Sequence, residues 1–207
     1  MPLHLWLSLV TICFLGAISP GPSLAVVIRN TLVGGRMNGF VTAISHGLGI
    51  ILWALLTATG LGLLIISNPD LFNGIRLAGA VVLLFLGARC LLARSGTHET
   101  INVESQQVRT TSPFRDGFLI SITNPKIAIF FLALFSQFVR PDAGWFEKLI
   151  MAVTAGFIDT LWYAVVALAL SHSAILTRLR RRSGLLEKIF GIVLVILAIR
   201  VISFSPF

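Results

Sequence analysis

The stretch Ser19-Pro20-Gly21-Pro22 interrupts an apolar segment that runs from about residue 3 to residue 28. Each proline lacks the N–H that an α-helix needs, and glycine holds helical backbone weakly, so these four residues cannot continue a helix. Inside a hydrocarbon layer the freed backbone groups find no water, and such a break is tolerated only beside protein or a wet cavity. The stretch therefore marks a candidate site within a membrane.

The composition is that of an integral membrane protein. Of the 207 residues, 56% are hydrophobic and 12% are charged, whereas about a quarter of a typical soluble domain is charged. The formal net charge of +8 comes mostly from arginines between apolar runs, which indicates a topology signal rather than nucleic-acid binding. No basic region precedes the first apolar run, so we expect no cleaved signal peptide.

Six apolar runs are each about long enough to cross a membrane as a helix, which takes ~20 residues. They cover residues 3–28, 39–66, 71–93, 114–139, 145–171 and 185–204. A short turn is expected at 31–38 and a polar surface loop at 95–113. The sequence therefore predicts an all-α integral membrane protein with six transmembrane helices in a single domain, residues 1–207.

Positive charges alternate between the connections of these six spans. Lysines and arginines gather in the first, third and fifth connections, at Arg29, Arg36, Arg94, Arg109, Arg115 and the cluster at 178–188. Because cytoplasmic loops carry the excess of Lys and Arg, we expect both termini outside the cell and loop 95–113 in the cytoplasm. The arginines of 178–182 are also expected to contact anionic lipids.

The two halves of the chain, residues 1–94 and 114–207, resemble each other. Three correspondences, one per helix, follow in the same order: Ile18-Ser19-Pro20 with Thr123-Asn124-Pro125, Gly47 with Gly156, and Gly79 with Gly191. Three spans per half is an odd number, so the halves have opposite orientations. This predicts an inverted repeat whose interrupted first and fourth helices build a transport site near the membrane midplane.

The breaks predict which residues bind the substrate. The N-terminus of a half-helix offers free N–H groups and a partial positive charge to a carboxylate, and Gly21 lets a ligand approach the backbone closely. The expected substrate-binding residues are Ser19, Pro20, Gly21, Pro22, Thr123, Asn124, Pro125 and Lys126. For Ser19, Thr123 and Asn124, hydrogen bonds to local backbone are the alternative.

Two charges, Lys126 and Asp159, fall near the centres of predicted spans. Each costs ~2.5–3.5 kcal/mol at the bilayer centre, so both side chains should face protein or water. Asp159 would bind a substrate ammonium, take up a coupling proton, or both; alternatively, Lys126 and Asp159 form a structural pair. His46, in the second span, would relay protons or only hydrogen-bond a neighbouring helix.

With these motifs the sequence resembles the lysine exporter and homoserine–threonine exporter (LysE/RhtB) family of amino-acid efflux proteins. The resemblance covers essentially the whole chain and is carried by Ser19-Pro20-Gly21-Pro22, Gly39, Gly47, Phe118-Leu119, Ser121-Ile122-Thr123-Asn124-Pro125-Lys126, Phe130-Phe131 and Gln137-Phe138. It implies export of amino acids or close derivatives through the bacterial inner membrane, driven by the proton gradient. We expect amino acids, protons and membrane lipids as partners, and no cofactor, enzyme activity or nucleic acid.

Two other classes of function stay open. A metal-ion exporter would need three or more ligands together, but the histidines at 4, 46, 98 and 172 are scattered. A thiol redox relay would need a cysteine in each interrupted helix, whereas Cys13 lies in the first span and Cys90 ends the third. The small residues Gly39, Ala43 and Gly47 suit close helix packing, either inside the chain or in a homodimer.

Overall fold

Every element in the described part of the chain is an α-helix, which confirms the all-α prediction. The computed structural model describes residues 1–92, 112–140, 142–170 and 173–203, without the side chains of 173–183 and 186. The helices are α1 (Leu3–Ile18), α2 (Pro22–Ser67), α3 (Pro69–Leu92), α4 (Pro113–Thr123), α5 (Pro125–Phe138), α6 (Trp145–Ala169) and α7 (Ser173–Ser203). Most of loop 95–113, His98, His172 and the arginine side chains of 178–182 lie outside the described residues.

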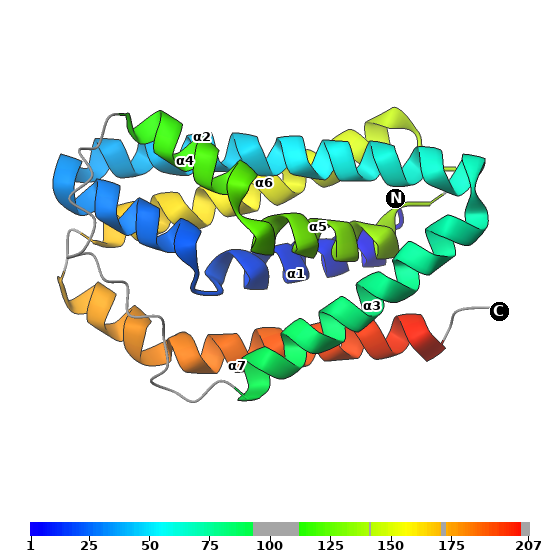
Figure 1. Cartoon of the computed structure of the whole chain (residues 1–207). Helices are drawn as coiled ribbons and strands as arrows, with labels where there is room; N and C mark the ends of the chain where they lie inside the picture. The colour runs from blue at the N-terminus through cyan, green and yellow to red at the C-terminus, as the bar shows by residue number, and fades with distance from the viewer. Residues whose placement is uncertain (93–111, 141, 171–172, 204–207) are drawn as a thin grey trace.

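The first predicted break is present, but the turn expected at 31–38 is much shorter. Helix α1 ends at Ile18, and Pro22 opens α2 as its first residue. Helix α2 then continues for 46 residues, of which only Gly35 leaves helical geometry, at φ 76° and ψ 179°. A straight helix of that length would measure about 69 Å, more than twice a bilayer core of about 30 Å. Gly35 is where the chain folds back (Figure 1), because glycine tolerates positive φ.

The second predicted break is confirmed between α4 and α5. The two helices are bent by 55° at Asn124 and together are apolar enough to form one membrane span. The Asn124 side chain caps α5 by accepting a hydrogen bond from the backbone N–H of Lys126 at 3.0 Å. Proline at the first helical position and a capping asparagine before it are both typical helix starts.

Among the described residues, α2, α3 and α6 are each long and apolar enough to cross a membrane, and the bent α4–α5 pair adds a fourth candidate span. Helix α1 is apolar but has only 16 residues, so it spans only together with the part of α2 before Gly35. The arrangement is compatible with six spans in two inverted repeats, which stay a prediction.

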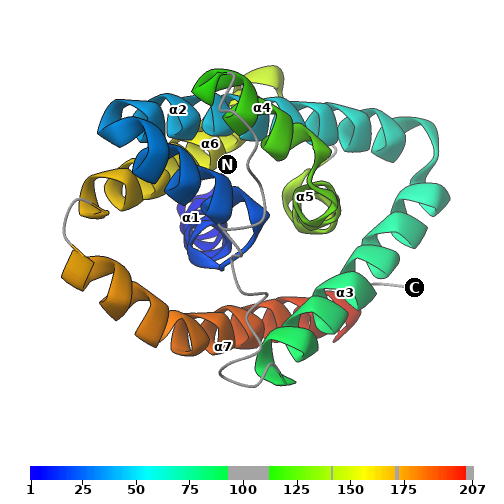
Figure 2. The same ribbon diagram turned by 60° about the vertical axis from the view of Figure 1, so that its left-hand side comes forward.

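Helices α3 and α7 pack together along one side of the molecule, where α3 lies against α5 and α7 against α1 (Figures 1 and 2). The start of α1 and the end of α7 lie at the same end of the molecule, and α4 and α7 begin at the opposite end (Figure 1). The two ends of the described chain therefore share one side, as an even number of spans requires.

Two pairs of glycines bring helix backbones into direct contact. A Cβ added to Gly47 would lie 2.9 Å from the carbonyl oxygen of Gly156, and one added to Gly156 would lie 2.7 Å from that of Gly47. Gly87 of α3 and Gly191 of α7 form a similar contact, because a Cβ added to either glycine would lie 2.8 Å from the carbonyl oxygen of the other. Gly79 packs on α5, where an added Cβ would lie 3.2 Å from the backbone of Ala133.

The small-residue face of α2 is used inside the chain. Ala43 is fully buried, and a Cβ on Gly39 would lie 2.7 Å from the side chain of Ala167 in α6. Together with the Gly47 contact to Gly156, this face lies against α6. Of the two roles predicted for it, the structure shows the internal one.

Candidate functional site

A cavity of about 70 Å³ lies between the two helix breaks. Since one water needs roughly 10–15 Å³ of such space, the cavity holds several waters or a small solute. Its polar wall includes Ser19, Ser23, His46, Asn124, Lys126 and Asp159, and its apolar wall includes Ile50, Ile127, Phe130, Phe131 and Phe190. Gly21 and Pro22 of the first break also line it.

Lys126 joins the two breaks. It lies in the first turn of α5, and its Nζ donates hydrogen bonds to Ser19 Oγ at 3.1 Å and to the carbonyl oxygen of Pro20 at 3.4 Å. A buried ammonium needs acceptors, and the interrupted backbone supplies one of them. The cation therefore lies at the cavity wall, beside the N-terminus of α5.

Asn124 makes a second connection between the breaks. Its Nδ2 donates to Ser23 Oγ at 3.3 Å, in the first turn of α2, while its Oδ1 caps α5. The side chain is buried, so both ends of its amide are engaged. Asn124 thus meets the local-backbone expectation and lines the cavity as well.

Asp159 pairs with His46, and not with Lys126 as the structural alternative expected. The Nδ1 of His46 and the Oδ2 of Asp159 lie 2.6 Å apart, and both residues are buried. The Nε2 of His46 has no hydrogen-bond partner. The ring of Tyr163 packs edge-on against the imidazole, with centroids 5.0 Å apart. The crossing of α2 and α6 at Gly47 and Gly156 brings the pair together.

Three of the expected binding residues do not line the cavity. Thr123 is exposed, and its hydroxyl donates to the carbonyl oxygen of Leu119 at 2.8 Å, which is the local bonding given as the alternative. Pro125 is exposed, and Pro20 contributes only its carbonyl to Lys126. The prolines therefore shape the breaks, while their neighbours carry the polar atoms.

Several lining residues were missed from the sequence. Tyr163 follows Asp159 by four residues, one helical turn on the same face, and that spacing could have identified it. Ser23 directly follows the break. No sequence pattern identifies Phe190 as a lining residue, because its position depends on how α7 packs against the other helices.

The described residues show no alternative centre for metal or thiol chemistry. They contain no group of three or more His, Cys, Asp or Glu side chains able to hold a metal ion. Cys13 is buried at the cavity and Cys90 is half-buried in α3, both as free thiols. The cavity instead offers an ammonium from α5, a carboxylate–imidazole pair from α6 and α2, and an apolar wall.

Comparison with known proteins adds a family match. The family described as LysE type translocator matches residues 14–204. An uncharacterised membrane protein of Pseudomonas aeruginosa is 31% identical over 148 residues, 69% of this chain and 68% of the relative. The uncharacterised membrane protein YahN of Escherichia coli is 25% identical over 205 residues, 97% and 90% of the two chains.

A relative with a named activity is the leucine efflux protein of Salmonella typhimurium. It is 32% identical over 141 residues, which cover 68% of this chain and 66% of the relative. No solved structure matches the chain.

Proposed function

The chain belongs to the LysE type translocator family, and from that membership we propose that it exports small amino acids or close derivatives from the cytoplasm, coupled to the proton gradient. The family consists of membrane transporters rather than enzymes. We propose the bacterial inner membrane as its location, with both termini outside.

The observation that carries this proposal is the pairing of opposite charges at one cavity. An amino acid presents a carboxylate and an ammonium on the same carbon. Lys126, at the positive N-terminal end of the α5 helix dipole, suits the carboxylate. Asp159 suits the ammonium. Both groups line the same cavity between the breaks.

The His46–Asp159 pair supports proton coupling. Asp159 can be neutralised by a substrate ammonium or by a proton, and the two compete for the same oxygen atoms. His46 lies at hydrogen-bonding distance from that carboxylate, and its Nε2 has no hydrogen-bond partner, which supports a role for His46 in passing protons to Asp159. Because the Asp159 carboxylate holds either the substrate ammonium or a proton, but not both, outward movement of the substrate is coupled to inward movement of protons.

The apolar wall favours a substrate with an uncharged side chain. A third charge in the cavity would lack a partner and would carry a large desolvation penalty. The related Salmonella protein is named for leucine efflux, and an aliphatic amino acid agrees with the isoleucines and phenylalanines that line this cavity.

Polar contacts join the two halves at both ends of the molecule. Asn30 of α2 donates to Asp116 of α4 at 3.2 Å at one end, and the Met1 ammonium pairs with Glu147 of α6 at 3.2 Å at the other. Alternating access requires such contacts to open in turn while the halves rock around the fixed site.

The test is efflux from proteoliposomes that contain labelled amino acids, with and without a pH gradient across the membrane. We expect gradient-dependent export, and we expect Asp159→Asn to abolish the response to the gradient while expression stays normal. Asp142→Asn is the matched control, because Asp142 makes an exposed ion pair with Arg140. Normal gradient-driven export by Asp159→Asn would exclude the coupling role.

A further inference from the structure

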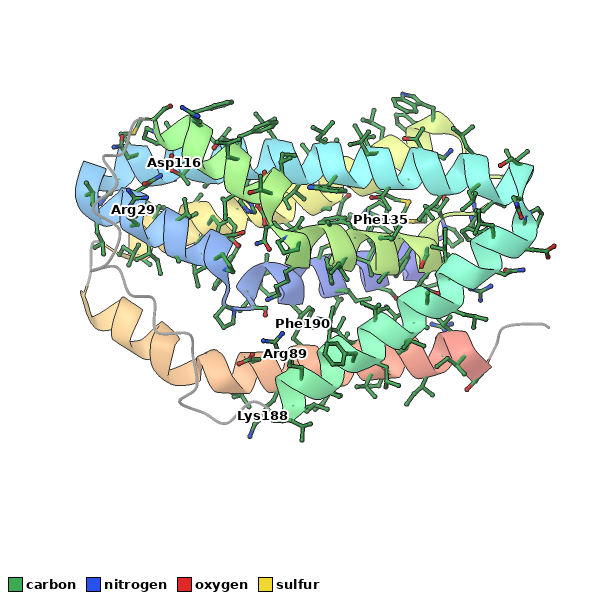
Figure 3. All side chains as sticks on the ribbon, in the orientation of Figure 1. Arg29, Arg89, Asp116, Phe135, Lys188 and Phe190 are labelled. Carbon is green, nitrogen blue, oxygen red and sulfur yellow. The ribbon has the colours of Figure 1, made fainter. Side chains whose placement is uncertain are left out.

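Phe190 is the part of α7 that reaches the cavity. The other lining residues come from α1, α2, α5, α6 and the two helix breaks, and α3 supplies none. Phe190 is 3% exposed and points from α7 toward the bundle (Figure 3). Its neighbours Ile189 and Ile192 are 40% and 49% exposed, so the ring alone brings this stretch of α7 to the site.

The Phe190 ring closes a wall of aromatic side chains. Its centroid lies 6.0 Å from that of Phe130, which lies 5.6 Å from that of Phe131 in an edge-on contact. Behind Phe130 stands Gly16, where an added Cβ would lie 3.2 Å from the end of the Phe130 ring. Phe130 is therefore held between α1 and α7 and has little room to swing aside.

The backbone next to Phe190 is held as well. Gly191 contacts the backbone of Gly87, with an added Cβ only 2.8 Å from the Gly87 carbonyl oxygen. Helix α7 cannot move closer to α3 at this point, because no side chain separates the two backbones. The glycine contact therefore fixes the separation of the two helix backbones next to Phe190.

The size of the cavity decides what this wall excludes. An apolar cavity that binds benzene measures about 150 Å³, roughly twice the 70 Å³ found here. We infer that Phe190, whose ring closes the wall of this small cavity, sets a size preference for the substrate side chain, so that amino acids compete less well as their side chains grow from aliphatic to aromatic. This inference rests on the proposed function and deepens it.

The first experiment uses the unchanged protein. Leucine export into a common buffer is measured while alanine, valine, leucine, phenylalanine or tryptophan competes on the loading side. We expect inhibition by the aliphatic amino acids and at least tenfold weaker inhibition by the aromatic pair, in keeping with size discrimination in an apolar pocket. Equal inhibition by leucine and phenylalanine would overturn the size preference.

The second experiment changes the wall. Phe190→Ala is expected to shift the preference for leucine over phenylalanine by at least tenfold toward phenylalanine, and Phe190→Leu by less. Ile189→Ala, one residue away on the lipid-facing side, is the matched control and should leave the preference unchanged.

The outcomes separate the two proposals. If the unchanged protein exports no amino acid at all, the proposed function fails. If it exports leucine and Phe190→Ala does so with an unaltered preference, only the inference about Phe190 fails. Should Phe190→Ala not fold, Phe190→Leu and the competition series still decide the question.

Discussion

The crossing of α2 and α6 predicts the effect of one added methyl group. In Gly156→Ala the new Cβ would lie 2.7 Å from the Gly47 carbonyl oxygen, whereas ordinary contact begins near 3.4 Å. The two helices must therefore separate by about 0.7 Å. Because His46 neighbours Gly47 and Asp159 lies one turn after Gly156, their 2.6 Å contact would lengthen to about 3.3 Å, beyond the usual range of a hydrogen bond.

Three terms set the expected loss of stability. Overpacking costs about 1–3 kcal/mol, and the weakened His46–Asp159 hydrogen bond adds up to about 1.5–3 kcal/mol. The higher helix propensity of alanine offsets about 1 kcal/mol of this. We expect a net loss of about 2 kcal/mol, which lowers Tm by roughly 4–8 °C for a protein of this size.

The assay is thermal unfolding of the purified protein in detergent, together with gradient-driven efflux. The matched control is Gly60→Ala in α2, where an added Cβ meets nothing within 4 Å and helix propensity alone should raise Tm by roughly 2–4 °C. A Tm for Gly156→Ala equal to that of Gly60→Ala would refute the backbone contact. Full gradient-driven export at a lowered Tm would refute its link to the His46–Asp159 pair.

Two further predictions concern Lys126 and the topology. Lys126→Met removes an ammonium whose hydrogen bond to the substrate is worth about 1.5–3 kcal/mol, so substrate affinity in binding titrations should fall roughly 10–150-fold. Lys188→Met, at an exposed position of α7, is the control and should bind substrate normally. Unchanged affinity in Lys126→Met would show that Lys126 does not bind the substrate. An epitope tag in 95–113 should be labelled only after the membrane is permeabilised, since this connection carries Arg94, Arg109 and Arg115. Labelling in intact cells would reverse the proposed orientation.

Both helix breaks could be predicted from sequence because their cause is local. Proline and glycine determine backbone geometry within a few residues, so Pro20–Pro22 and Pro125 located the interruptions directly. The charged residues of the site could be predicted for a similar reason. A buried charge at a span centre needs a partner or a wet cavity, and both Lys126 and Asp159 line the cavity.

The partners of these charges could not be predicted, because they depend on how helices cross. Nothing in the spacing of His46 and Asp159 places them 2.6 Å apart; the Gly47–Gly156 contact does. Thr123 adopts the local alternative instead, since its exposed hydroxyl bonds the Leu119 carbonyl one turn earlier in the same helix. The turn at Gly35 was predicted too wide, because a single residue at positive φ reverses the chain without interrupting the helices on either side.

Lys126 has consequences for the two halves of a transport cycle. Its ammonium contacts a hydroxyl and a carbonyl and forms no ion pair with any described residue. In the proposed function, a loaded carrier changes its access with this charge neutralised by the substrate carboxylate, while an empty carrier does so with the charge unbalanced in a low-dielectric interior. The empty return is then the slower half-cycle. Amino acid supplied outside the cell would bind the returning carrier and neutralise this charge. One-for-one exchange of amino acid is then faster than net export.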